Sequence, residues 1–247
     1  MKIKEKKVVL ITGGSRGIGK ALVEKFKKQG WLVATCATHL DHLSESVADL
    51  NFKCNVTDST EVKAGISNVL QSLGQLDALI NNAGLAGTNL LEPDAPSQVS
   101  DDLWNAIINV NLHGTYFMCK NAIPHLPDQT GKIINIASVL ALKGVPDATA
   151  YCAAKHGVLG LTRALAQYLA PRRITVNAIC PGWVRTDMAT ERMQEIGITE
   201  EDLKKQVPLG AMIEPDQIAD LAYFLASSDA SLAMTGQALS IDGGVTP

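Results

Sequence analysis

Short apolar runs, rich in β-branched residues, alternate with longer helical stretches along the whole of this chain of 247 residues. The runs carry few polar residues, so strands formed from them would be buried on both faces. Strands of this kind, separated by helices, are typical of a parallel sheet that helices cover on both sides. The pattern predicts an α/β protein: a single domain with a doubly wound fold of three layers and a parallel sheet of about seven strands.

The expected elements follow from the positions of the apolar runs and of the glycines and prolines that end them. We expect strands at residues 7–12, 31–37, 52–55, 76–81, 132–138, 174–179 and 238–241. We expect helices at residues 18–29, 59–73, 101–122, 149–170 and 215–226. Residues 89–100 are predicted to form a loop, and residues 183–208 an irregular, partly helical segment beside the site. No repeat or linker interrupts the chain, so residues 1–247 are predicted to form one nucleotide-binding domain of Rossmann type.

Charge and composition exclude several classes of protein. The net charge of −3 argues against a nucleic-acid binder, because phosphates require a basic surface. No apolar run reaches the length of a membrane span, and the first residues lack the apolar core of a signal peptide. The five cysteines form no C-x-x-C pair, so neither a disulfide framework nor a metal site is expected. These features predict a cytoplasmic protein with no membrane partner.

A glycine-rich turn joins the first expected strand to the first expected helix, in the sequence Thr12-Gly13-Gly14-Ser15-Arg16-Gly17-Ile18-Gly19. Glycine allows a ligand to approach the backbone closely, and the free N–H groups at a helix start favour a pyrophosphate. The spacing is G-x-x-x-G-x-G and differs from the usual G-x-G-x-x-G pattern. Because the turn lies between a strand and a helix, it predicts a dinucleotide site.

The end of the second strand indicates which dinucleotide is bound. A carboxylate there would bind the ribose 2′-OH of NAD and repel the 2′-phosphate of NADP. This strand runs into Thr38 and His39 without an acid, and Asp41 comes three residues too late. Thr38 can donate a hydrogen bond to a phosphate, and Arg16 can supply positive charge. NADP(H) is therefore favoured, while NAD(H) stays possible.

Tyr151 and Lys155 are four residues apart on an expected helix, so their side chains share one face. A phenol has a pKa of about 10, and a nearby ammonium group favours the phenolate. We therefore expect Lys155 to lower the pKa of Tyr151 toward the range in which it can act as an acid or base. Ser138 lies shortly upstream, at the end of a strand.

Together these motifs resemble the short-chain dehydrogenase/reductase family over essentially the whole chain. The resemblance rests on the glycine turn, Asn81-Asn82-Ala83-Gly84, Asp58, Asn111, Ser138, the Tyr151/Lys155 pair and Pro181-Gly182-Trp183-Val184-Arg185-Thr186. It implies four catalytic residues: Asn111, Ser138, Tyr151 and Lys155. It implies that the cofactor is bound by Gly13, Ser15, Arg16, Gly17, Ile18, Gly19, Thr38, Asp58, Asn82, Ala83, Gly84, Tyr151, Lys155, Pro181, Gly182, Val184 and Thr186.

The resemblance also implies a role for each catalytic residue. Tyr151 would exchange a proton with the substrate oxygen, and Ser138 would hold that oxygen. Lys155 would tune Tyr151 and bind the ribose hydroxyls. Asn111 would hold a water that links Lys155 to solvent. The reaction implied is the reversible reduction of a ketone to a secondary alcohol.

The substrate is less constrained than the reaction. The chain looks most like bacterial 3-oxoacyl-[acyl-carrier-protein] reductases, although its acidic residues 85–100 do not suit an acidic carrier protein. Residues expected to border an acyl chain are Val139, Leu140, Leu142, Trp183, Met188, Met193 and Ile196. A dehydrogenase of another secondary alcohol, such as a hydroxyacyl-CoA, a hydroxybutyrate or a sugar alcohol, stays open, as does a nucleotide-sensing protein without catalysis.

Two further expectations concern surfaces. The apolar helices around residues 104–118 and 149–170 correspond to those that form subunit contacts in the family, which implies a homotetramer. Arg185 and Asp187 are expected either to contact the substrate or to stabilise the segment that carries them.

Overall fold

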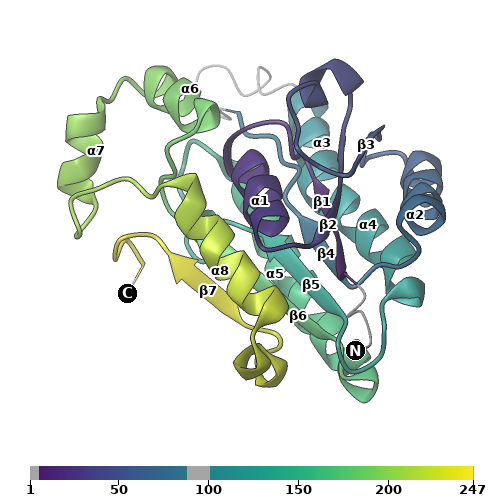
Figure 1. The fold of residues 1–247 in the computed structure, drawn as a ribbon. Helices are drawn as coiled ribbons and strands as arrows, with labels where there is room; N and C mark the ends of the chain where they lie inside the picture. The colour runs from purple at the N-terminus through teal and green to yellow at the C-terminus, as the bar shows by residue number, and fades with distance from the viewer. Residues whose placement is uncertain (1–5, 88–100, 247) are drawn as a thin grey trace.

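The computed structural model describes residues 6–87 and 101–246, and the predicted loop at 89–100 lies outside them. Seven parallel strands form one sheet in the order β3-β2-β1-β4-β5-β6-β7 (Figure 1). The strands are β1 (Val8–Thr12), β2 (Leu32–Ala37), β3 (Leu50–Lys53), β4 (Ala78–Asn81), β5 (Lys132–Ile136), β6 (Thr175–Pro181) and β7 (Ala238–Ile241). The prediction of a doubly wound α/β fold with about seven parallel strands is confirmed.

The sheet is buried on both faces because successive side chains of a strand point to opposite sides. In β1, Val8 and Leu10 join one apolar cluster, while Val9 and Ile11 join the other. The first cluster packs under α2 (Ser59–Leu73), α4 (Gly114–Ala122) and α5 (Thr149–Leu169). The second packs under α1 (Gly17–Lys28) and α8 (Pro215–Ser227), which lie side by side on the opposite face (Figure 1).

Strand order reverses between β1 and β4. The chain moves outward from β1 to β2 and β3, then crosses back to place β4 on the other side of β1. A crevice opens beyond the carboxyl ends of the strands at such a point, and ligands of doubly wound folds bind there. The topology therefore places the glycine turn after β1 and the segment after β4 at one site.

The prediction of a single helix at residues 101–122 is wrong in detail. The structure has α3 (Asp101–Ile108), a π-helical turn η2 (Asn109–His113) and α4 in succession. Within the π turn, the Asn111 side chain donates hydrogen bonds to the carbonyls of Leu85 at 2.7 Å and Ile107 at 2.9 Å. Widened turns of this kind inside α-helices occur frequently at functional sites.

Two short helices follow β6 and stand outside the three layers (Figure 1). They are α6 (Asp187–Glu195) and α7 (Glu200–Gln206), within the segment predicted to be irregular and partly helical. We call residues 183–208 the substrate segment. Short 3₁₀ turns complete the fold at Leu40–Leu43, Ile123–His125, Val139–Ala141, Ala170–Arg172 and Asp229–Ala233. Across residues 6–87 and 101–246, no helix is both long and apolar enough to span a membrane.

Candidate active site

A cavity of about 1100 Å³ opens at the carboxyl ends of the strands, where the topology predicts a ligand site. It reaches from the end of β2, past the glycine turn, to the substrate segment. Its lining contains the predicted residues Gly13, Ser15, Arg16, Gly17, Ile18, Gly19, Thr38, Asn82, Ala83, Gly84, Ser138, Tyr151, Lys155, Pro181, Gly182, Val184 and Thr186. Residues from six separate parts of the chain therefore meet in one cavity.

Asp58 and Asn111 are the two predicted site residues that do not line this cavity. The Asp58 carboxylate caps α2, because it accepts hydrogen bonds from the backbone N–H groups of Thr60 and Glu61 at 2.7 and 3.1 Å. That bonding gives Asp58 a local structural role. Its neighbours Asn55 and Val56 line the cavity in its place, and the sequence analysis did not single them out.

The glycine turn is shaped by close backbone contacts. Gly13 has a φ of +70°, a conformation that side chains other than glycine rarely adopt. A Cβ atom on Gly19 would lie 1.9 Å from the carbonyl oxygen of Gly13, so the start of α1 folds against the turn only without a side chain there. The turn thus presents the N-terminus of α1 to the cavity, as a pyrophosphate site requires.

Thr12 and Asn82 join the end of β1 to the segment after β4. The Thr12 hydroxyl accepts hydrogen bonds from the backbone N–H groups of Asn82 at 3.0 Å and Ala83 at 2.9 Å. The Asn82 side chain in turn donates to the carbonyls of Thr12 and Gly13, both at 3.0 Å. Thr12 was not predicted as a site residue, although its place directly before Gly13 could have suggested it.

Among the residues that the structure describes, no acidic side chain lines the end of the cavity next to β2. Arg16, Thr38 and His42 line it there, together with Cys36 and Ala37. The centroid of the His42 ring lies 5.2 Å from that of the His39 ring. No local pattern in the sequence indicated that His42 borders the cavity.

Ser138, Tyr151 and Lys155 meet at the centre of the cavity. Ser138 lies between β5 and the 3₁₀ turn that begins at Val139, while Tyr151 and Lys155 lie one turn apart on α5. The Lys155 ammonium donates a 2.9 Å hydrogen bond to the carbonyl of Ile136 and lies 5.4 Å from the centroid of the Tyr151 ring. Lys155 is only 4% exposed, so its position is fixed by the carbonyl and by packing.

The pKa of Tyr151 differs from the sequence-based expectation. Burial raises it to about 12, and a hydrogen bond with Ser138 offsets only part of that rise. Burial also lowers the pKa of Lys155 to about 8. The expectation of a lowered pKa for Tyr151 is therefore wrong for the protein groups by themselves, because desolvation by burial is the largest influence on this phenol.

Asn111 lies behind the cavity wall, fully buried. Its Oδ1 atom has no hydrogen-bond partner among the described residues. A Cβ atom on Gly84 would lie 3.0 Å from this Oδ1 and 3.8 Å from the Lys155 ammonium, so all three groups are neighbours. A buried amide oxygen of this kind is suited to accept a hydrogen bond from a water.

The substrate end of the cavity is mainly apolar. Of the predicted residues, Val139, Leu140, Trp183, Met188 and Ile196 line it. Leu142 and Met193 do not: Leu142 is 39% exposed, and Met193 packs on an apolar cluster of Ala189, Leu203, Val207 and Met212. Charged lining residues that the sequence analysis missed are Lys143, Asp147 and Arg192.

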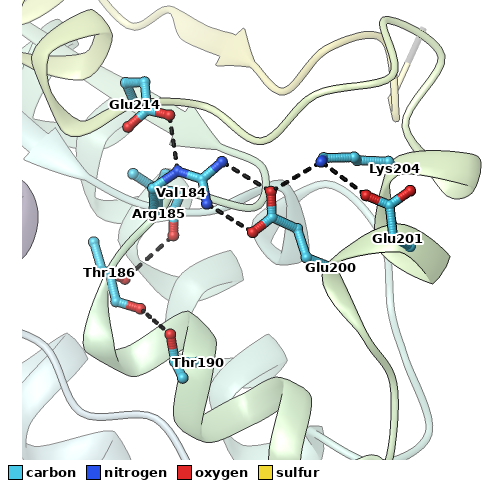
Figure 2. A network of polar contacts seen from close by, with 8 residues as sticks. All are labelled: Val184, Arg185, Thr186, Thr190, Glu200, Glu201, Lys204 and Glu214. Carbon is cyan, nitrogen blue, oxygen red and sulfur yellow. Dashed lines mark hydrogen bonds and ion pairs between the residues drawn. The ribbon is translucent and has the colours of Figure 1, made fainter.

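Arg185 stabilises the substrate segment and does not line the cavity. Its guanidinium donates two hydrogen bonds to Glu200, at 2.7 and 2.9 Å, and one to Glu214 at 2.9 Å (Figure 2). Of the two roles expected for Arg185 and Asp187, Arg185 has the structural one, whereas Asp187 borders the cavity.

The comparisons with known proteins agree with this geometry. The family model described as "Enoyl-(Acyl carrier protein) reductase" matches residues 13–246. The 3-oxoacyl-[acyl-carrier-protein] reductase FabG of Thermotoga maritima is 38% identical, with 98% of both chains covered. The chain belongs to the short-chain dehydrogenase/reductase family. As a member of this family it is an oxidoreductase.

Solved structures of this family superpose closely on the chain. A variant of actinorhodin polyketide ketoreductase with NADPH has a TM-score of 0.89 at 31% identity and covers 99% of both chains. The aldohexose dehydrogenase of Thermoplasma acidophilum, in ligand-free form, has a TM-score of 0.87 at 33% identity, covering 98% of this chain and 94% of its own. The fold is therefore shared with these proteins over nearly the full length.

Proposed function

We propose that this protein is an NADP(H)-dependent reductase of 3-oxoacyl thioesters, working as one domain with residues 183–208 as its substrate segment. The observation that carries the proposal is the cavity, in which Ser138, Tyr151 and Lys155 face an apolar substrate end and a phosphate-binding turn. The relatives described above include a 3-oxoacyl-[acyl-carrier-protein] reductase and a polyketide ketoreductase.

The choice of NADP(H) rests on the end of the cavity next to β2. Arg16 and Thr38 would hold the 2′-phosphate, with His42 beside them, and none of the described residues that line this end has a carboxylate to repel it. The N-terminus of α1 would hold the pyrophosphate. The bound NADPH supplies the hydride that reduces the ketone.

The residues of the chain then handle the proton and the developing charge. Ser138 donates a hydrogen bond to the ketone oxygen and orients it. Tyr151 donates its proton to that oxygen as negative charge develops there. The raised pKa of Tyr151, about 12, keeps the phenol protonated and ready to act as the acid in this direction. Lys155 lies close enough to stabilise the phenolate that remains, and Asn111 would hold a water for its reprotonation.

The direct test is steady-state reduction of acetoacetyl-CoA by the purified protein, followed through NADPH absorbance. We expect turnover with NADPH and much slower turnover with NADH. Absence of any turnover with acetoacetyl-CoA and with acetoacetyl-N-acetylcysteamine would contradict the proposed substrate class.

A second candidate is a sugar dehydrogenase. Asp147 and Arg192 place a charged pair in the substrate end of the cavity, and such groups also bind hydroxyls well. The aldohexose dehydrogenase described above has the same fold. Aldohexoses with NADP⁺ belong in the same assay, and faster turnover of a sugar than of the thioester would favour this candidate.

Assembly and location complete the proposal. Trp104 on α3, Tyr116 on α4 and Tyr168 on α5 are 39%, 44% and 72% exposed, so these helices present aromatic side chains that a second subunit could cover. They support a homotetramer, which light scattering would test. The five cysteines are free thiols, which supports a reducing compartment such as the cytoplasm.

A further inference from the structure

An ion pair bridges two parts of the cavity wall that are far apart in the chain. Arg192, on α6, donates a hydrogen bond through Nη2 to Oδ2 of Asp147, in the turn before α5. Both residues line the cavity, and their side chains are only 16% and 24% exposed. Asp147 comes four residues before Tyr151, so the pair ties the substrate segment directly to the catalytic helix.

The other contacts of the substrate segment act away from this point. Arg185 fixes its base by binding Glu200 and Glu214 (Figure 2). Within the segment, Leu203 and Val207 pack in an apolar cluster. These contacts fix where the segment begins and how α7 sits, and Ala189 and Met193 of α6 pack in the same cluster. Val207 and Ala189 also line the cavity, whereas Arg185 and Leu203 do not. The contact with Asp147 is made by Arg192 in the C-terminal half of α6, and Asp187, Met188 and Ala189 of the same helix also line the cavity.

Because of its surroundings, this ion pair is expected to contribute more to stability than a pair in open solvent. Fully exposed pairs contribute little, because water and salt screen them. Here both side chains are mostly shielded, and the loss of one partner would leave the other charge facing the substrate end. Arg192 also contacts Glu195 at 3.2 Å on the same helix, which orients its side chain along α6.

We propose that Arg192 and Asp147 are a positioning pair for the reaction. Their contact holds α6 across the substrate end of the cavity and so fixes the wall against which the substrate lies beside Ser138 and Tyr151. Neither residue handles the proton or the hydride. The kinetic part of the proposal rests on the proposed function, whereas the structural part concerns the segment itself.

The kinetic test uses Arg192→Gln, Asp147→Asn and the double variant. Each single variant is expected to raise the KM for acetoacetyl-CoA about tenfold, between the effects of exposed and buried pairs. We expect kcat to stay within about twofold, because the groups that transfer the proton are unchanged. The double variant is expected to match the singles, because the two residues act through one contact. Arg192→Lys keeps the charge and is expected to bring the KM most of the way back to the wild-type value.

A matched control and a second measurement keep the outcome clear. Lys205→Gln removes an exposed pair with Asp202 on the same segment and is expected to leave KM unchanged. Amide hydrogen exchange, measured with NADPH bound, is expected to be about tenfold faster in α6 of both single variants, and unchanged in α8.

Unchanged exchange in α6 overturns the proposal, whether or not the thioester is the substrate. The proposal is also overturned if the two substitutions act independently, so that their effects on KM multiply in the double variant. If the wild-type protein does not reduce the thioester, the proposed function fails, and the exchange measurement still decides whether the pair holds the segment.

Discussion

The ammonium of Lys155 lies 5.4 Å from the centroid of the Tyr151 ring, one turn away on α5, and bonds to the carbonyl of Ile136. Burial shifts the pKa values of the two groups in opposite directions. It raises the pKa of Tyr151 to about 12 and lowers that of Lys155 to about 8, so each is driven toward its neutral form. The site is therefore costly for the free protein to maintain, and the pH dependence of its stability reports on that cost.

Lys155→Met is expected to stabilise the free protein at pH 7 while abolishing turnover. A pKa lowered from about 10.5 to about 8 corresponds to a penalty of about 3 kcal/mol for the buried charge. The lost hydrogen bond to Ile136 offsets about 1 kcal/mol of the gain. Urea denaturation at pH 7 should therefore show a higher free energy of unfolding by about 1–2 kcal/mol.

The same substitution gives a signed pH dependence. Because the pKa of Lys155 is lower in the folded protein, the unfolded chain binds more protons between pH 8 and about pH 10.5. The free energy of unfolding of the wild type therefore rises with pH through that window because of Lys155. The difference by which the Met variant exceeds it should shrink. The Tyr151 titration contributes mainly above pH 10, because its pKa is about 10 in the unfolded chain and about 12 in the folded protein. A difference in the free energy of unfolding between the two proteins that stays constant from pH 7 to 10 would contradict the lowered pKa of Lys155.

Tyr151→Phe is expected to reduce kcat by about 10²–10⁴-fold, the usual contribution of a positioned acid. Cofactor binding should persist, because the ring remains and only the hydroxyl is lost. Stopped-flow kinetics would measure the loss, and a thermal shift with NADPH would verify binding. A variant that kept a large fraction of the wild-type rate would exclude Tyr151 as the acid.

Thr38→Asp is expected to reverse the choice of cofactor. The new carboxylate would repel a 2′-phosphate and accept a hydrogen bond from a 2′-hydroxyl. The Kd for NADPH should rise at least about tenfold, and NADH should bind better than to the wild type. Thr38→Val is the control, since it removes the hydroxyl without adding charge and should give NADH no gain. Equal effects of the two substitutions would show that charge at this position is not what selects the cofactor.

Gly19→Ala is expected to weaken cofactor binding about tenfold or more, because its Cβ would lie 1.9 Å from the Gly13 carbonyl oxygen and must displace the turn. Gly160→Ala on α5 is a matched control, as no heavy atom lies within 4 Å of the added carbon. Isothermal titration with NADPH would compare them. Equal affinities would mean that the turn tolerates displacement without losing its pyrophosphate site.

Much of the architecture was predictable from local patterns. Apolar runs such as Val8–Thr12 predicted the buried strands, because a strand covered on both faces has no polar side. The predicted helix boundaries at Ser59–Leu73 agree with the structure, since Asp58 caps the start and Gly74 ends it in a left-handed conformation. The helix at 101–122 was not predicted correctly, because no local signal distinguishes the π turn at Asn111 from an ordinary turn.

The sequence by itself determined the order of strands and helices, the glycine turn and the spacing that aligns Tyr151 with Lys155. These features depend on neighbours along the chain, so periodicity and spacing suffice to reveal them. Only the tertiary structure decided how far each group is desolvated, and therefore why the pKa of Tyr151 rises although an ammonium lies close by. Only the tertiary structure also placed Arg192 against Asp147, because that contact joins residues from different elements, and no local pattern encodes it.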